Sequence, residues 1–332
     1  MIVWLLFGAC TAIILLTGTR LSKYGDVLAE KTGLGGTWIG VVLMASVTSL
    51  PELITGISSI SVFDLPNIAA GDAIGSCMFN LVILSFLDLG HPVPLSTRAH
   101  QGHALSAAFG TLLLGLVVLG VLAGHRVPQV AWIGVSSFAF IVVYLVAMRM
   151  IFLHERRRVA RFIEAMAEEL RYQNISKERA LTHYVVNAVI LIGAATYLPH
   201  LGERIAELTG LGQTFVANII IALSTSLPEV AVSIAAARIG AIDMAVANLF
   251  GSNLFNIVIL ALDDILYLKG PLLLQISAGH IVAAIAAICM TAIAIIGLNY
   301  RASGKKPLPA AWDSVGILAI YVVAMYVLYA SR

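Results

Sequence analysis

The sequence predicts an all-α integral membrane protein with ten transmembrane helices, arranged as two inverted five-helix repeats. Three observations support this fold class. The 332 residues are 60% hydrophobic and 11% charged, with a mean hydropathy of +0.95, whereas about one-quarter of the residues of a soluble domain are charged. Ten apolar stretches have about the length needed to cross a bilayer. A polar motif in the first half of the chain recurs in the second half.

The ten apolar stretches are separated by polar loops. A helix needs about 20 mainly apolar residues to cross a hydrocarbon core of roughly 30 Å. We expect the first stretch to be a retained helix rather than a signal peptide, because Met1–Leu6 contains no Lys or Arg. The predicted spans are 2–19, 37–62, 66–88, 103–123, 130–150, 180–199, 212–237, 241–266, 278–298 and 312–329.

The basic residues predict the orientation of these spans. Most Lys and Arg residues fall in the loops after the first, third, fifth, seventh and ninth stretches. Short cytoplasmic loops are enriched in Lys and Arg. We therefore expect both termini on the extracytoplasmic side of a multi-pass protein, and the short loops suggest the inner (plasma) membrane of a prokaryote.

The longest polar stretch, residues 154–179, divides the chain into an N-terminal repeat, 1–153, and a C-terminal repeat, 180–332. Apolar residues recur within it at helical spacing. It therefore predicts an amphipathic helix at the cytoplasmic surface, an extension of the fifth span, or simply a solvated connector. It is too short to hold a folded regulatory domain.

The two halves share a pair of motifs, over residues 45–80 and 222–256. Ala45–Glu52 (Ala-Ser-Val-Thr-Ser-Leu-Pro-Glu) and Ala222–Glu229 (Ala-Leu-Ser-Thr-Ser-Leu-Pro-Glu) are identical at six of eight positions. Gly75–Asn80 and Gly251–Asn256 follow at nearly the same distance in each half. Because each half has an odd number of predicted spans, the second half enters the membrane from the opposite side. Inverted repeats of this kind are common in transporters that work by alternating access.

The repeated motif places a proline and a carboxylate inside an apolar segment. Pro51 and Pro228 each remove a backbone hydrogen bond and free a carbonyl in the preceding turn, and a bound cation is one partner for such a carbonyl. Glu52 and Glu229 follow directly. A charge at that depth costs on the order of 3 kcal/mol and is usually paired or functional. No Lys or Arg lies in the middle of a predicted span to pair with these carboxylates.

Oxygen-bearing side chains surround the two glutamates in the motif. On a helix, the hydroxyls one turn earlier share a face with the carboxylate, and the Ser and Asn four residues apart in the second motif share a face of the next span. Calcium takes six to eight oxygen ligands, and two Glu would neutralise it. A lone hydroxyl in a membrane helix more often bonds its own backbone, but repetition in both halves favours ion binding. The candidate ligands are Glu52, Glu229, Thr48, Ser49, Thr225, Ser226, Ser76, Asn80, Ser252 and Asn256. We interpret Gly71, Gly75 and Gly251 as sites of close helix packing.

At these residues the chain resembles the calcium/cation antiporter superfamily, and within it the sodium/calcium exchanger branch. The family's two alpha repeats carry a Gly-Thr-Ser-x-Pro-Glu motif, similar to Thr48–Glu52 and Thr225–Glu229, and a Gly-Ser-Asn-x-x-Asn/Asp motif, similar to Gly75–Asn80 and Gly251–Asn256. The resemblance implies calcium export driven by an ion gradient, with the first and sixth spans sliding against the rest. It also implies that the backbone carbonyls of Ala45 and Ala222 are ligands.

The chain departs from the family pattern at several positions. Val47 and Ser224 replace a glycine, and Cys77 replaces an asparagine. Asn256 is neutral where many sodium/calcium exchangers have aspartate, as in proton-coupled relatives.

Asp72 stands where relatives have asparagine, and its counterpart in the second half is Asn248. It is either a third carboxylate for a proton or second ion, or a residue of the external mouth, which we favour.

The sequence thus predicts an antiporter that exchanges Ca²⁺ for Na⁺ by alternating access at a site near the middle of the membrane. A Ca²⁺/H⁺ antiporter using the same site is the alternative, and a cation channel or a non-transporting membrane scaffold ranks lower. We expect no enzymatic activity, because the histidines mostly fall near predicted span ends with no nucleophile pattern beside them. We expect no cofactor and no nucleic-acid partner. We expect the protein to lie in the lipid bilayer and to be a monomer, although the sequence does not determine the oligomeric state.

Overall fold

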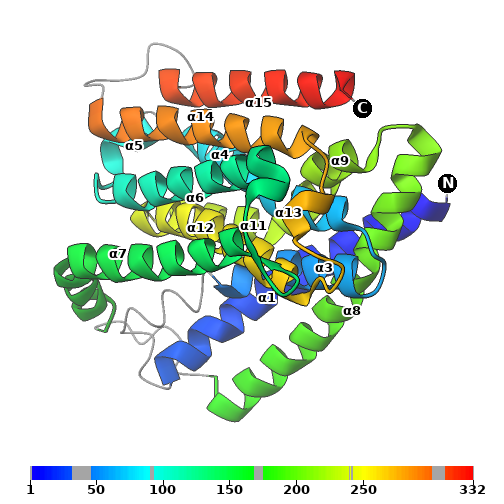
Figure 1. Ribbon diagram of the computed structural model, residues 1–332. Coiled ribbons are helices and arrows are strands. Elements are labelled where there is room, and N and C mark those ends of the chain that lie inside the picture. The colour runs from blue at the N-terminus through cyan, green and yellow to red at the C-terminus, as the bar shows by residue number, and fades with distance from the viewer. Residues whose placement is uncertain are drawn as a thin grey trace.

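The computed structural model describes residues 2–31, 46–89, 93–167, 175–238, 240, 242–300 and 311–331. Almost all of these residues are helical (Figure 1). In the first half the helices are α1 (Ile2–Lys31), α3 (Leu50–Ser61), α4 (Pro66–Leu89), α5 (Leu95–Arg98), α6 (His103–Ala123) and α7 (Val135–Ala167). Between α6 and α7 lie a 3₁₀ turn, η1 (Gly124–Arg126), and an antiparallel ribbon of β1 (Gln129–Val130) and β2 (Ile133–Gly134).

The second half repeats this order of long and short helices. It contains α8 (Lys177–Thr209), α9 (Gln213–Phe215), the π-helix η2 (Val216–Ile221), α10 (Ala222–Thr225), α11 (Leu227–Arg238), α12 (Ile242–Leu266), α13 (Leu272–Gln275), α14 (Gly279–Tyr300) and α15 (Trp312–Ala330). The short helices α5 and α13 occupy corresponding places, each directly after the long helix that carries the second motif.

The long helices overlap the predicted spans, but α1, α7 and α8 continue beyond the predicted ends at residues 19, 150 and 199. Eight helices among the described residues are long and apolar enough to cross a membrane. A ninth span results if residues 213–238, which bend by 45° between α10 and α11, are counted as one. The predicted span 37–62 begins outside the described residues and ends in α3. The number of ten crossings therefore stays a prediction.

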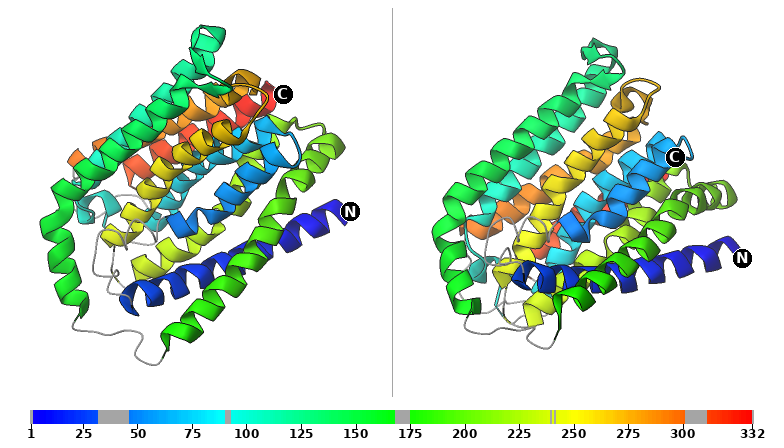
Figure 2. Two further views of the ribbon diagram at one scale, coloured as in Figure 1. Left: turned by 60° about the horizontal axis from the view of Figure 1, so that its bottom comes forward. Right: turned by 90° about the horizontal axis from the view of Figure 1, so that it is seen from below.

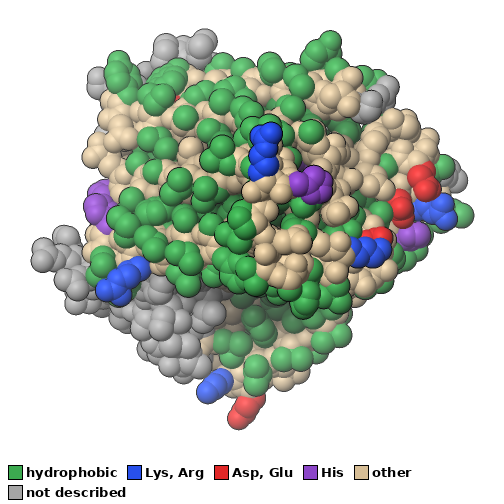
Figure 3. All heavy atoms as spheres, viewed as in Figure 1, with side chains coloured by type: hydrophobic (Ala, Val, Ile, Leu, Met, Phe, Trp, Pro, Cys, Tyr) green, Lys and Arg blue, Asp and Glu red, His purple; other side chains and the backbone are tan. Residues whose placement is uncertain are grey.

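Hydrophobic side chains cover much of the surface, as expected for a protein that faces lipid. The face shown in Figure 3 is largely hydrophobic and has few charged side chains. The outer helices expose large apolar residues, such as Val189 of α8 and Val322 of α15. In contrast, α4 and α12, which carry the second motif of each half, are mostly buried. The polar motifs therefore lie in the interior of the bundle.

The core divides into two hydrophobic clusters. The larger one joins α4, α6, α12, α14 and α15. The smaller one is built on α1 and α8, with Leu21 and Leu191 fully buried in it. These two helices pack against each other along one side of the bundle (Figure 2). The two chain ends lie toward the same end of the bundle in Figures 1 and 2.

The helix α7 continues beyond the predicted end of the fifth span, as far as Ala167. Of the three alternatives for residues 154–179, the extension of the fifth span therefore holds up to that residue. Residues 168–174 of the predicted linker lie outside the described part of the chain.

Two buried aspartates anchor the ends of the long central helices in the same way. Asp88, at the end of α4, accepts hydrogen bonds from the backbone N–H of Leu95 (2.7 Å) and Ala311 (2.9 Å), which precedes α15. Asp264, at the end of α12, accepts from the N–H of Leu272 (2.5 Å) and Gly134 (2.9 Å), which precedes α7. Each aspartate therefore supplies acceptors for N–H groups that have no partner within their own helix.

Candidate ion site

The helices of the first motif break at the same serine in both halves. Ser49 has φ −88° and ψ 16° and precedes α3, while Ser226 has φ −83° and ψ 7° and precedes α11. Pro51 and Pro228 follow two residues later, in the first turn of the new helix, where a missing N–H leaves no unmade bond. The glutamates therefore lie in the first turn after a break, directed into the bundle interior.

The two glutamates are bonded by the serines of the opposite half. The Ser226 hydroxyl donates to Glu52 Oε1 at 2.9 Å, and the Ser49 hydroxyl donates to Glu229 Oε1 at 3.1 Å. The exposed fractions of Glu52 and Glu229 are 2% and 1%. Residues about 180 positions apart in the chain therefore form one buried polar centre, as the repeated motif predicted.

In each half, the serine of the second motif also donates a hydrogen bond to the glutamate of the same half. The Ser76 hydroxyl donates to Glu52 at 3.3 Å, and the Ser252 hydroxyl donates to Glu229 at 3.4 Å. The hydroxyl oxygens of Ser226 and Ser76 lie 3.0 Å apart. Both carboxylates therefore face two hydroxyls each, one from α4 or α12 and one from the opposite helix break.

The threonines of the motif contact the opposite half at Asp72 and Asn248. The Thr225 hydroxyl donates to Asp72 Oδ1 at 2.7 Å, and the Thr48 hydroxyl donates to Asn248 Oδ1 at 3.5 Å. Asp72 is 1% exposed. Asp72 is therefore buried in this conformation, and its place in the external mouth of the pathway stays a prediction. The helix α4 begins at Pro66, nearly two turns earlier, and Thr225 covers the carboxylate from the other half.

The amides of the second motif form a chain between α4 and α12. The Asn80 amide donates to Asn253 Oδ1 at 2.9 Å, and the Asn253 amide donates to the Cys77 carbonyl at 3.2 Å. Asn256 is fully buried, and its amide has no hydrogen-bond partner among the described residues. We had not selected Asn253, although it is the asparagine that the first half replaces by Cys77. Comparing the two motifs position by position would have found it.

Several buried oxygens in this centre have no partner within the described ranges: Oε2 of Glu52, Oε2 of Glu229, Oδ2 of Asp72, and the side-chain oxygens of Asn80 and Asn256. No group of three or more His, Cys, Asp and Glu residues in the described part gathers closely enough to hold a metal ion. A cation here would therefore rely on two carboxylates with hydroxyl and amide oxygens, which are the ligands that hard cations prefer.

Of the two backbone carbonyls expected to be ligands, those of Ala45 and Ala222, the structure describes only the second. The Ala222 carbonyl already accepts from the Ser226 N–H at 3.1 Å. Ala45 lies outside the described residues.

A π-helix leads into the second copy of the first motif. Within η2, the Asn218 backbone packs directly onto Gly75, where a Cβ atom would overlap the Asn218 carbonyl. Gly71 packs onto Ala217 in the same way. Both glycines therefore permit close packing, as we interpreted them. π-helical turns often occur at functional sites, and this one adjoins the Ala222–Glu229 motif.

A match to a protein-family model identifies the family of the chain. The model of the family described as "Sodium/calcium exchanger protein" matches residues 2–153 and again residues 180–330. The chain belongs to this family. It is therefore a multi-pass membrane protein of an antiporter family.

Relatives of this sodium/calcium exchanger family member are moderately similar in sequence. An uncharacterized membrane protein of Methanocaldococcus jannaschii is 26% identical over 86% of this chain and 85% of its own length. The inner membrane protein YrbG of Escherichia coli is 26% identical over 74% of both chains. The sodium/calcium exchanger MaX1 of Methanosarcina acetivorans is 32% identical over 43% of this chain and 38% of its own length.

Solved structures share the fold over nearly the whole chain. The H⁺/Ca²⁺ exchanger CAX superposes with a TM-score of 0.72 at 14% identity, covering 99% of this chain and 85% of that one. The sodium-calcium exchanger NCX_Mj superposes with a TM-score of 0.62 at 19% identity, covering 98% of both chains. At these identities the likeness concerns the fold alone.

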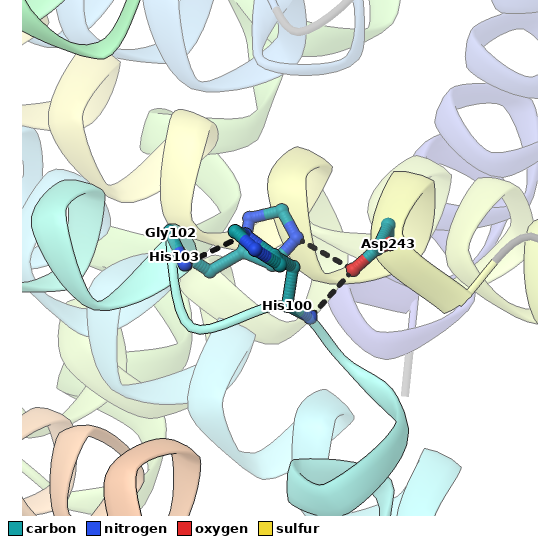
Figure 4. Close-up of polar contacts among 4 residues, drawn as sticks. All are labelled: His100, Gly102, His103 and Asp243. Carbon is teal, nitrogen blue, oxygen red and sulfur yellow. Dashed lines mark hydrogen bonds and ion pairs between the residues drawn. The ribbon is translucent and has the colours of Figure 1, made fainter. Parts of the chain in front are cut away.

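A second polar cluster lies where α6 and α12 begin (Figure 4). His103 Nε2 is 3.0 Å from Asp243 Oδ1, and the His100 N–H donates to the same oxygen at 2.7 Å. The Gly102 N–H donates to His100 Nδ1 at 2.9 Å. The Asp243 side chain is half exposed. This cluster fixes the loop before α6 to the start of α12 and is separate from the glutamate centre.

Proposed function

We propose that this protein is a secondary antiporter that exchanges Ca²⁺ for Na⁺ by alternating access at the Glu52 and Glu229 centre. The observation that carries this proposal is the crossed bonding, in which each glutamate accepts a hydrogen bond from the serine of the other half. In this proposal α1 and α8, one helix from each half, slide past this shared site, so that it opens to either side of the membrane in turn.

The chemistry of the centre suits exchange between one divalent and two monovalent ions. Two carboxylates neutralise either one Ca²⁺ or two Na⁺, and each glutamate retains an oxygen with no partner among the described residues. The hydroxyls can rotate and offer lone pairs to an ion instead of donating to the carboxylates. The proposed ligands are Glu52, Glu229, Thr48, Ser49, Thr225, Ser226, Ser76, Asn80, Ser252, Asn256 and the carbonyls of Ala45 and Ala222.

Exchange is obligatory in this proposal because an empty site carries two negative charges in the bundle interior. Such a site disfavours the closed intermediate through which the protein must pass, whereas a neutralised site favours it. The protein therefore changes its open side only with ions bound.

The proposal includes ten crossings as two inverted five-helix repeats, 1–153 and 180–332, joined by the linker 154–179. It places the protein in the inner (plasma) membrane with both termini extracytoplasmic. The matched helix breaks, the crossed serine bonds and the corresponding anchoring roles of Asp88 and Asp264 support a two-fold relation between the halves.

A Ca²⁺/H⁺ antiporter that uses the same site is the second candidate. The neutral Asn256 favours it, because this position adds no third carboxylate to the centre. In that case the glutamates would carry protons in place of sodium.

The test is calcium uptake into proteoliposomes, first with internal sodium at matched pH and then with a proton gradient and no sodium. We expect uptake with internal sodium, and loss of uptake in Glu52→Gln and Glu229→Gln. The matched control is Glu207→Gln, which removes an exposed carboxylate paired with Arg204 on the protein surface. This variant should transport normally.

The outcomes separate the candidates. Uptake only with the proton gradient would establish the second candidate. Calcium flux down its own gradient without a counter-ion would indicate a channel. Uptake that is unchanged in both glutamine variants would contradict the proposed site, and a complete absence of uptake in the unmodified protein would favour a scaffold.

A further inference from the structure

Asp263 is a buried carboxylate with none of the hydroxyl partners that the motifs supply to the glutamates. Asp263 lies near the end of α12 and is 0% exposed. Neither of its carboxylate oxygens has a hydrogen-bond partner among the described residues. The adjacent Asp264 differs, because its oxygens accept from two backbone N–H groups and from the Ser137 hydroxyl. Asp264 therefore serves the fold, whereas Asp263 has no structural role that these contacts explain.

Gly56 of α3 makes the space that Asp263 occupies. A Cβ atom at position 56 would lie 2.5 Å from Asp263 Oδ2 and 2.8 Å from Oδ1. Gly56 is one helical turn after Glu52 on the same face of α3, a separation of about 6 Å. The Asp263 carboxylate is therefore packed on the helix that carries Glu52, close to the proposed site but outside it.

The charges around Asp263 are negative. Asp72 of α4 is close enough for its carboxylate and that of Asp263 to repel each other. Asp264 lies beside it on α12 and Glu52 lies one turn away on α3. The basic groups at this end of α12 are exposed: Lys269 is paired with Asp64, and Arg126 lies in η1. Arg98 of α5 and Arg238 of α11 lie at the opposite end of α12.

The size of the space and the lack of ligands restrict what can neutralise Asp263. Calcium needs six to eight oxygens, and a hydrated ion needs room that a carboxylate packed on a glycine backbone does not leave. A proton needs one oxygen and no additional volume. A carboxyl group that is removed from water and unpaired is more stable in its neutral form.

We propose that Asp263 is a proton-binding residue of this protein, which holds a proton when the glutamate site is empty of cations and releases it when calcium binds there. The two positive charges of Ca²⁺, one helical turn away, favour ionised Asp263, and the released proton passes to the aqueous phase. Departure of calcium reverses the step. The inference rests on the proposed calcium site. The first half has Leu87 at the corresponding position, so only one such residue is present.

The test is calorimetric titration of purified full-length protein with calcium in two buffers that differ in their enthalpy of protonation, which gives the number of protons released per calcium. We expect Asp263→Asn to bind calcium and to release one proton fewer than the unmodified protein. The control is Asp64→Asn, which removes an exposed carboxylate that is paired with Lys269. It should leave the proton count unchanged.

Infrared spectroscopy provides a second readout that reports the proton directly. The calcium-free protein should show the carbonyl stretch of a protonated carboxylic acid, which calcium removes. Asp263→Asn should lack this band, and Asp263→Glu should retain it at a shifted frequency. An unchanged proton count and band in Asp263→Asn would overturn the inference. Failure of the unmodified protein to bind calcium would instead contradict the proposed function.

Discussion

Ser226 combines three roles in the ion site. It marks the break before α11, donates to Glu52 of the opposite half, and contacts Ser76. As a proposed ligand, its hydroxyl oxygen contacts the cation when the site is loaded, so Ser226→Ala removes one oxygen from the ion. The contact of a hydroxyl with a charged group is comparable to a charge-assisted hydrogen bond, which contributes about 1.5–3 kcal/mol.

We therefore expect Ser226→Ala to weaken calcium binding by roughly 10- to 100-fold, the equivalent of that energy. The matched control is Ser85→Ala, because Ser85 is equally buried but donates to the Leu81 carbonyl of its own helix. Calorimetric or radiotracer titration of both variants measures the difference. Equal affinities in the two variants would contradict the role of Ser226.

Asp72 and Asn248 occupy corresponding positions and accept from corresponding threonines. An amide therefore suffices for this contact in one half of the protein. We expect Asp72→Asn to retain the Thr225 bond and to transport calcium within a factor of about three of the unmodified protein, a change of less than 1 kcal/mol. Asp72→Leu, which cannot accept the bond, should transport far less. Uptake assays over a range of pH test both variants, and a changed pH profile in Asp72→Asn would show that Asp72 has a coupling role.

At the scale of elements, the contact between η2 and α4 positions the second copy of the first motif, Ala222–Glu229. The π-helix places the Asn218 backbone against Gly75, one residue before Ser76. This close approach holds the helix break at Ser226 beside α4, within reach of both Ser76 and Glu52. A bulkier residue at position 75 would separate the elements that share the site.

We expect Gly75→Ala to destabilise the protein by about 1–3 kcal/mol through overpacking. Its control is Gly115→Ala in α6, where an added Cβ meets nothing within 4 Å and alanine favours the helix by about 0.5–1 kcal/mol. The fraction of monodisperse protein left after heating compares the two. If Gly75→Ala is as heat-resistant as Gly115→Ala, the close approach does not limit the fold.

At the scale of the molecule, α1 and α8 form a body with its own apolar cluster beside the larger core. The resemblance to the family implies that these two helices slide during transport. One polar contact between α1 and the site region is the hydrogen bond from Thr11 to Ser224, at 3.1 Å. This contact lies where the two bodies would move past each other.

A Thr11→Cys, Ser224→Cys double variant, in a background with Cys10→Ala, should therefore form a cross-link under oxidation. We expect the cross-link to abolish calcium uptake and a reducing agent to restore it. Each single cysteine variant under the same oxidation is the control. Full transport by the cross-linked protein would show that α1 does not move against this part of the core.

The sequence by itself determined the membrane environment, the approximate limits of most long helices and the residues of the two motifs. Apolar length and internal repetition are local properties, and they predicted α6 as 103–123 and the pairing of Glu52 with Glu229 in one centre. An alignment of the two second motifs could also have predicted Asn253 as a site residue, because it occupies the position that Cys77 has in the first half.

Only the tertiary structure decided which side chains of opposite halves bond each other. The crossing of Ser226 to Glu52, the burial of Asp72 under Thr225 and the packing of Asp263 on Gly56 depend on how helices far apart in the chain are placed. Periodicity predicts the face of a helix on which a residue lies, but not the neighbour that this face meets. That neighbour is fixed by packing between the halves, which no local pattern contains.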